Sequence, residues 1–149
     1  MKKSFFRLVS KILLFNFLIF ISLLSLHELG HAIFASILGC RAKAIIFDSS
    51  FPNPHTEIIC ERNLEILAMG GLIFTLPLSF LFKIIGKEGD FLFYVVFGLS
   101  LFLSISDFSY FPPLANLRPL MEFTGIALMV YGECRLGWLV GEEAYRKLI

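Results

Sequence analysis

The chain has 149 residues, of which 57% are hydrophobic and only 17% are charged, and its formal net charge is +1. Ordinary soluble domains contain about 45–50% apolar and about 25% charged residues, and a soluble globule of this size could not bury so much apolar surface. The composition also excludes a disordered chain, and the small net charge gives no basic field that would attract nucleic acid. We therefore expect an integral, multi-pass membrane protein that is embedded in the lipid bilayer.

Four apolar segments are candidates for membrane-spanning helices. A helix needs roughly 20 apolar residues to cross the hydrocarbon core of a bilayer. The four segments are residues 12–38, 64–85, 91–106 and 120–140. Pro77 lies inside the second segment, and membrane helices tolerate proline when neighbouring groups satisfy the freed carbonyl. The sequence thus predicts an all-α membrane protein with about four transmembrane helices, folded as a single membrane-embedded domain over residues 1–149.

A turn-rich segment separates the first two apolar segments. Residues 42–47 and 56–60 are short, isoleucine-containing runs on either side of residues 48–54, which contain two prolines. Short apolar runs around such a turn predict a β-hairpin. Cys40 and Cys60 flank the hairpin and could pair in an oxidising compartment, or they could remain free thiols.

The distribution of lysine and arginine indicates an orientation. With four spans and the N-terminus inside, nine of the thirteen basic residues lie on the inner side and four on the outer side. Cytoplasmic loops carry an excess of basic residues. We therefore expect both termini in the cytoplasm.

The first apolar segment contains the sequence His27-Glu28-Leu29-Gly30-His31. Residues four apart lie on one face of a helix, one turn apart, so that two imidazoles can bind one metal ion. In this HExxH arrangement the two histidines bind zinc and the glutamate is the general base. Ionisable groups within an apolar helix are costly and usually mark a functional site. The alternative reading is a pair of helix-packing histidines beside a glutamate.

The flanks of the motif are apolar on both sides, with Ser25-Leu26 before it and Ala32-Ile33-Phe34 after it. With these flanks the chain resembles the site-2 protease family of intramembrane zinc metalloproteases. The resemblance implies a metalloendopeptidase with one zinc ion, acting on transmembrane or membrane-proximal segments of membrane-protein substrates. Gly70-Gly71 falls where the family has a glycine-containing stretch, although close helix packing is the simpler reading. Residues 41–63 would supply the sheet-like segment of the family.

The resemblance also implies an aspartate as the third zinc ligand, and here the chain departs from the family pattern. Residues 116–125 can be aligned with the Asn…Pro…Asp-Gly motif of the family, but this alignment puts Thr124, a poor zinc ligand, at the position of the aspartate. Asp107, which follows the third apolar segment, is the preferred candidate, and Glu122 is the reserve. The predicted site thus consists of a catalytic base, Glu28, and three metal ligands, His27, His31 and Asp107.

Three other functions remain open at this stage. The first is a CAAX-protease-like or HtpX-like membrane zincin, whose third ligand is a downstream glutamate such as Glu122. The second is a catalytically inactive pseudoprotease that keeps the metal site, and Thr124 at the expected aspartate position favours it. The third is a small membrane interaction protein without a metal. His55, in the predicted turn, is expected to be a solvated loop residue.

Overall fold

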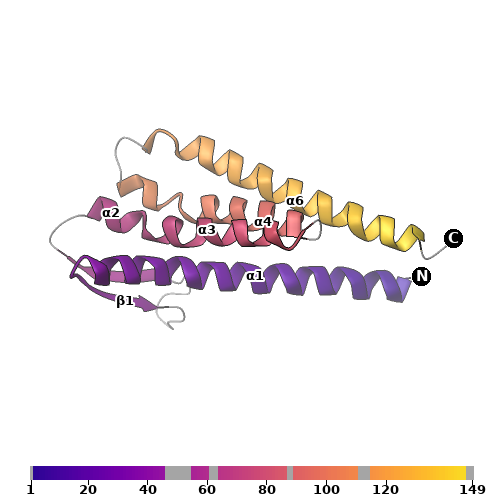
Figure 1. The fold of residues 1–149 in the computed structure, drawn as a ribbon, viewed down its shortest axis with the longest axis horizontal. Helices are drawn as coiled ribbons and strands as arrows, with labels where there is room; N and C mark the ends of the chain where they lie inside the picture. The colour runs from indigo at the N-terminus through magenta and orange to yellow at the C-terminus, as the bar shows by residue number, and fades with distance from the viewer. Residues whose placement is uncertain (1, 46–54, 61–63, 87–88, 111–114, 147–149) are drawn as a thin grey trace.

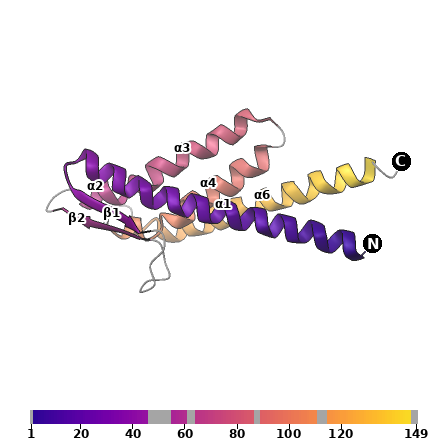
Figure 2. The ribbon, with the colours of Figure 1, turned by 90° about the horizontal axis from the view of Figure 1, so that it is seen from below.

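The structure is a computed structural model that describes residues 2–45, 55–60, 64–86, 89–110 and 115–146. The elements in chain order are α1 (Lys2–Ile37), β1 (Arg41–Ile45), β2 (His55–Ile59), α2 (Leu64–Ala68), α3 (Gly70–Ile84), α4 (Gly89–Leu103), the 3₁₀ helix η1 (Asp107–Tyr110) and α6 (Arg118–Arg146). The long helices lie side by side, with α3 and α4 between α1 and α6 (Figure 1). Both ends of the chain lie at one end of this bundle, and the hairpin and α2 lie at the other (Figures 1 and 2).

The mostly helical architecture and the hairpin after the first helix confirm these two parts of the predicted fold class. The second apolar segment is divided, however, because α2 ends at Ala68 and α3 begins at Gly70. The amide of Met69 donates to the carbonyl of Ile66, three residues back, which tightens the chain between the two helices. Pro77 lies inside α3 without ending it.

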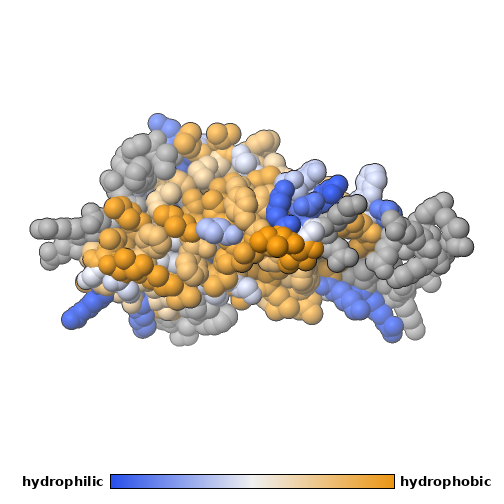
Figure 3. Space-filling view, in the orientation of Figure 1, coloured by the Kyte–Doolittle hydropathy of each residue, from blue (hydrophilic) through white to orange (hydrophobic). Residues whose placement is uncertain are grey.

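Two segments of the described chain are long and apolar enough to cross a membrane, Val9–Ile37 and Ile66–Ile84. Only 6% of the residues in the most apolar 18-residue window of the first segment are buried in the bundle, so most of this window is at least partly exposed. Apolar side chains also cover much of the face drawn in Figure 3. Helix α4 is apolar but has only 15 residues, and the fourth span, which coincides with α6, stays a prediction.

The two strands form an antiparallel hairpin beside the C-terminal part of α1. The register pairs Arg41 with Ile59 and Ala44 with Thr56. A disulfide between Cys40 and Cys60 joins the residue before β1 to the residue after β2, which decides between the two states expected for these cysteines. The turn predicted at residues 48–54 lies outside the described residues.

Glycines bring pairs of helices into close contact. A Cβ on Gly30 of α1 would lie 2.7 Å from the carbonyl oxygen of Gly70 in α3. In the same way, a Cβ on Gly125 of α6 would lie 2.8 Å from the carbonyl oxygen of Gly98 in α4. Small residues at such crossings let helix backbones approach closely, as in many membrane helix pairs. The close contact of α1 with α3 holds the HExxH segment against the rest of the bundle.

Asn16 and Glu133 form a polar contact between the outer helices. The Asn16 side-chain amide donates to Glu133 Oε1 at 2.9 Å, so α1 and α6 are joined although they are far apart in sequence. Both side chains are partly buried.

Candidate metal centre

Two elements far apart in sequence bring the candidate ligands together. His27 and His31 lie one turn apart on α1 and are 2% and 7% exposed. Asp107 is the first residue of η1, where the chain turns after α4. The amides of Asp107 and Phe108 both donate to the carbonyl of Ser104, and Phe108 is itself only 2% exposed. This anchored turn fixes the carboxylate of Asp107 opposite the two imidazoles.

Three potential ligand atoms converge on one point. His27 Nε2 lies 3.0 Å from Asp107 Oδ2, His31 Nε2 lies 3.4 Å from the same oxygen, and the two Nε2 atoms are 3.2 Å apart. Ligands at about 2.0–2.1 Å from a tetrahedral zinc ion are separated by roughly 3.3 Å, because the angle between them is about 109°. The group could therefore hold a metal ion with little rearrangement.

The electrostatics of the group also fit a cation. Asp107 Oδ2 is buried and has no hydrogen-bond partner within the described residues, although both imidazoles are close to it. Burial alone raises the pKa of the Asp107 carboxyl, but the neighbouring His27 and His31 lower this pKa below its ordinary value. The carboxylate is thus an anion buried between two imidazoles, and a cation bound by all three groups would balance its charge.

A backbone carbonyl fixes the tautomer of His31. His31 Nδ1 lies 2.8 Å from the carbonyl oxygen of Leu67 in α2. A carbonyl can only accept, so Nδ1 carries the proton and donates it, and in the neutral ring the lone pair of Nε2 is then available to a metal. The short helix α2, separated from α3 at Met69, therefore supports a ligand at the centre.

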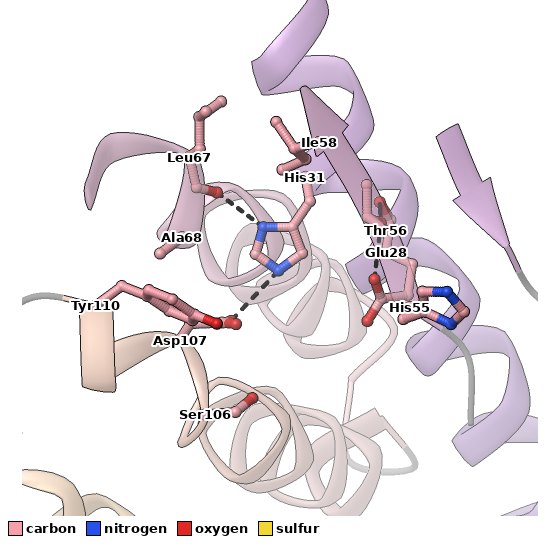
Figure 4. A pocket seen from close by; sticks show the side chains of 10 residues that line it. All are labelled: Glu28, His31, His55, Thr56, Ile58, Leu67, Ala68, Ser106, Asp107 and Tyr110. Carbon is pink, nitrogen blue, oxygen red and sulfur yellow. Dashed lines mark hydrogen bonds and ion pairs between the residues drawn. The ribbon is translucent and has the colours of Figure 1, made fainter. Parts of the chain in front are cut away.

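Glu28 lies beside the group of candidate ligands, and it lines a cavity together with His31 and Asp107 (Figure 4). Its side chain is 9% exposed, and its Oε2 accepts a hydrogen bond from the Thr56 hydroxyl at 2.7 Å. The cavity has a volume of about 420 Å³, within the range of small-molecule sites. Its walls come from α1, β2, α2 and the region of η1, and its lining residues are Glu28, His31, His55, Thr56, Ile58, Leu67, Ala68, Ser106, Asp107 and Tyr110.

The structure brings together the residues that the sequence predicted as ligands and leaves the other candidates apart. Glu122 and Thr124 lie on α6, outside the group of potential ligands among the described residues. His55 is the first residue of β2 and lines the cavity, so it is part of a strand and not a loop residue. Of the two glycines for which helix packing was the simpler interpretation, Gly70 packs against α1 and Gly71 lies against the His27 ring.

Sequence reasoning did not find the contributions of Thr56, Ser106 and Tyr110 to the cavity. Alternation along β2 predicts that Thr56 and Ile58 share one face of the hairpin. Nothing in the sequence indicates that this face turns toward α1, because the direction depends on how the hairpin folds back after Cys40.

In comparisons with known proteins, no protein family, no curated protein and no solved structure matches the chain.

Proposed function

We propose that the chain is an intramembrane zinc metalloprotease that hydrolyses peptide bonds in transmembrane or membrane-proximal segments of other membrane proteins. The observation that carries the proposal is the triangle of potential ligand atoms from His27, His31 and Asp107, whose sides are 3.0–3.4 Å. This triangle lies beside a cavity that Glu28 lines. The resemblance of the HExxH segment and its apolar flanks to site-2 proteases supports the same activity.

Zinc is the favoured metal because three protein ligands, two of them imidazoles, are typical of a catalytic zinc site with one open position. Two histidines and one carboxylate also suit non-haem iron(II). A glutamate next to the first histidine and facing the cavity favours zinc hydrolysis, because this chemistry needs a general base beside the metal.

The residues of the site have distinct roles in the proposed reaction. Bound zinc supplies Lewis acidity, which makes a water more acidic and polarises the scissile carbonyl. Glu28 accepts a proton from the attacking water and later gives it to the leaving nitrogen. His27, His31 and Asp107 would hold the metal, and the carbonyl of Leu67 orients His31 through its Nδ1 proton.

The position of the site supports a substrate within or next to the membrane. The two histidines lie near the C-terminal end of the apolar segment Val9–Ile37. The cavity is bounded on one side by β2, outside the apolar helices. A segment of a transmembrane substrate would have to unwind locally to expose its backbone in such a cavity, since the amides of a helix are hydrogen-bonded internally.

Metal analysis tests the first part of the proposal. Wild-type protein purified in detergent and dialysed against metal-free buffer is expected to retain one zinc per chain, and His27→Ala is expected to retain almost none. Elemental analysis by mass spectrometry distinguishes zinc from iron in the same sample. Wild-type protein that binds neither metal after reconstitution with zinc would rule out the proposed function.

Proteolysis is tested by comparing wild type with Glu28→Gln. The two proteins are expressed in the same host, and new protein N-termini in the membrane fraction are mapped by mass spectrometry. We expect new termini within or beside membrane-spanning segments of host proteins for wild type only, while both proteins contain zinc. Equal sets of termini in the two samples, with equal zinc, would favour the inactive pseudoprotease.

A further inference from the structure

Strand β2 contacts the predicted catalytic base directly. Thr56 Oγ1 lies 2.7 Å from the carboxylate oxygen Oε2 of Glu28 and 2.9 Å from the backbone carbonyl oxygen of the same residue. The hydroxyl has one proton, so it donates to one of these oxygens at a time. The shorter separation, to the carboxylate, is the usual length of an O–H···O hydrogen bond. The hairpin is thus connected to α1 at the residue on which the proposed chemistry depends.

Glu28 needs such a contact to keep a fixed direction. Its side chain has three rotatable bonds, and ordering such a side chain costs conformational entropy. The hydrogen bond to its carboxylate comes from Thr56, which belongs to β2 and not to α1. The direction of the carboxylate therefore depends on a residue of another element.

Thr56 is itself held on a well-supported element. It pairs with Ala44 of β1 in the antiparallel ladder. The Cys40–Cys60 disulfide joins the two strands at the open end of the hairpin, before β1 and after β2. Thr56 and Ile58 both line the cavity, as expected for residues two apart on a strand. Both strands also pack against α1.

We propose that Thr56 is a positioning residue that holds the Glu28 carboxylate in the direction needed to take a proton from a group bound at the His27–His31–Asp107 centre; this rests on the proposed function. A hydroxyl is both donor and acceptor. It can donate to the carboxylate before proton transfer and accept from the carboxylic acid afterwards. Thr56 can therefore stay hydrogen-bonded to Glu28 throughout the transfer.

Binding of a hydroxamate measures this role without turnover. N-acetyl-leucine hydroxamate chelates zinc as an anion, and its hydroxyl proton passes to the general base when it binds. Its dissociation constant can be measured by calorimetry on detergent-purified, zinc-loaded protein. The variants are Thr56→Val, which keeps the shape without the hydroxyl, Thr56→Ser, which keeps the hydroxyl, and Glu28→Gln, which removes the base. Thr124→Val, on α6 and outside the ligand group, is the matched control.

We expect all four variants to bind one zinc per chain. Thr56→Val should bind the hydroxamate about tenfold more weakly than wild type, in keeping with the loss of one hydrogen bond to a charged group. Glu28→Gln should weaken hydroxamate binding at least as much. The hydroxamate dissociation constants of Thr56→Ser and Thr124→Val should stay within about twofold of the wild-type value. If Thr56→Val does not yield folded protein, Thr56→Ala is expected to show the same weakening.

The outcomes separate this inference from the proposed function. Wild type that binds zinc and hydroxamate, together with a Thr56→Val protein that binds both equally well, would overturn the role of Thr56. Loss of zinc from Thr56→Val would also overturn it, because the strand would then support the ligands and not the base. If Thr56→Ser bound the hydroxamate as weakly as Thr56→Val does, the hydroxyl group would not be responsible for the effect, and the proposed role of Thr56 would be wrong. If the wild-type protein did not bind zinc at all, this result would instead contradict the proposed function.

Discussion

The imidazole ring of His27 occupies the space that a side chain on Gly71 would need. A Cβ on Gly71 would lie 2.6 Å from His27 Nδ1, which is closer than two such atoms approach in proteins. The ring therefore fits against the backbone of α3 only because residue 71 has no side chain. The neighbouring Gly70 serves the crossing of α1 and α3, so the two adjacent glycines have different tasks.

Gly71→Ala should displace His27 and weaken metal binding. The added methyl group would push the ring out of line with His31 and Asp107, and we expect zinc affinity to fall about 10- to 100-fold, as when a partner that orients a ligand is lost. Competition with a zinc chelator of known affinity measures the change.

Gly137→Ala is the matched control for this substitution, because a Cβ at residue 137 meets nothing within 4 Å. It lies inside α6, where alanine is favoured over glycine by about 1 kcal/mol. It should leave zinc affinity unchanged. Equal zinc affinity of Gly71→Ala and wild type would mean that His27 is not a ligand in its present position.

Asp107→Asn should nearly abolish zinc binding. The amide keeps the shape of the side chain but removes the negative charge, and a neutral amide is a poor zinc ligand. We expect a loss of affinity larger than the roughly 10- to 100-fold typical of residues that only support a ligand. Glu122→Gln should bind zinc as wild type does, since Glu122 is exposed on α6. The reverse result would assign the third ligand to α6.

Thiol labelling tests the hairpin closure. The chain has three cysteines, of which Cys40 and Cys60 are paired and Cys134 is free and exposed. Denatured, unreduced protein treated with a maleimide should carry one label per chain, and protein reduced first should carry three, as counted by intact mass. Since disulfides persist in oxidising compartments, the same result would agree with an outer position of the hairpin. Three labels without reduction would contradict the pairing.

Asn16→Leu should destabilise the contact between α1 and α6. It would leave Glu133 Oε1 without the amide donor at 2.9 Å, and hydrogen bonds between membrane helices contribute about 0.6–1.7 kcal/mol. A lower melting temperature in detergent is the expected result. Glu133→Gln keeps an acceptor for Asn16 and should be much closer to wild type, whereas equal destabilisation by both would indicate that the charge of Glu133 has another partner.

The proximity of the two candidate ligands on α1 was predictable from the sequence because their geometry is local. Residues 27 and 31 must share a helix face once the helix forms. Asp107 was harder, since a contact between residues so distant in sequence depends on where α4 ends and how the chain turns at Ser104. It could be preferred only by its residue type and by its place after an apolar segment.

The break between α2 and α3 was not predictable from hydropathy, because residues 64–85 are apolar along almost their whole length. It depends on the backbone at Met69 and on two following glycines, which are weak helix formers. The contact of Thr56 with Glu28 was not predictable for a different reason. A threonine in a strand is ordinary, and its contact with Glu28 depends on the packing of the hairpin against α1.

The three side chains of the candidate metal centre come from two distant parts of the chain, the imidazoles from α1 and the carboxylate from η1. An ion bound there would act as a crosslink that closes a loop containing the hairpin, α2, α3 and α4, in addition to any part in chemistry. Removing it with a chelator should then loosen the assembly of the helices themselves.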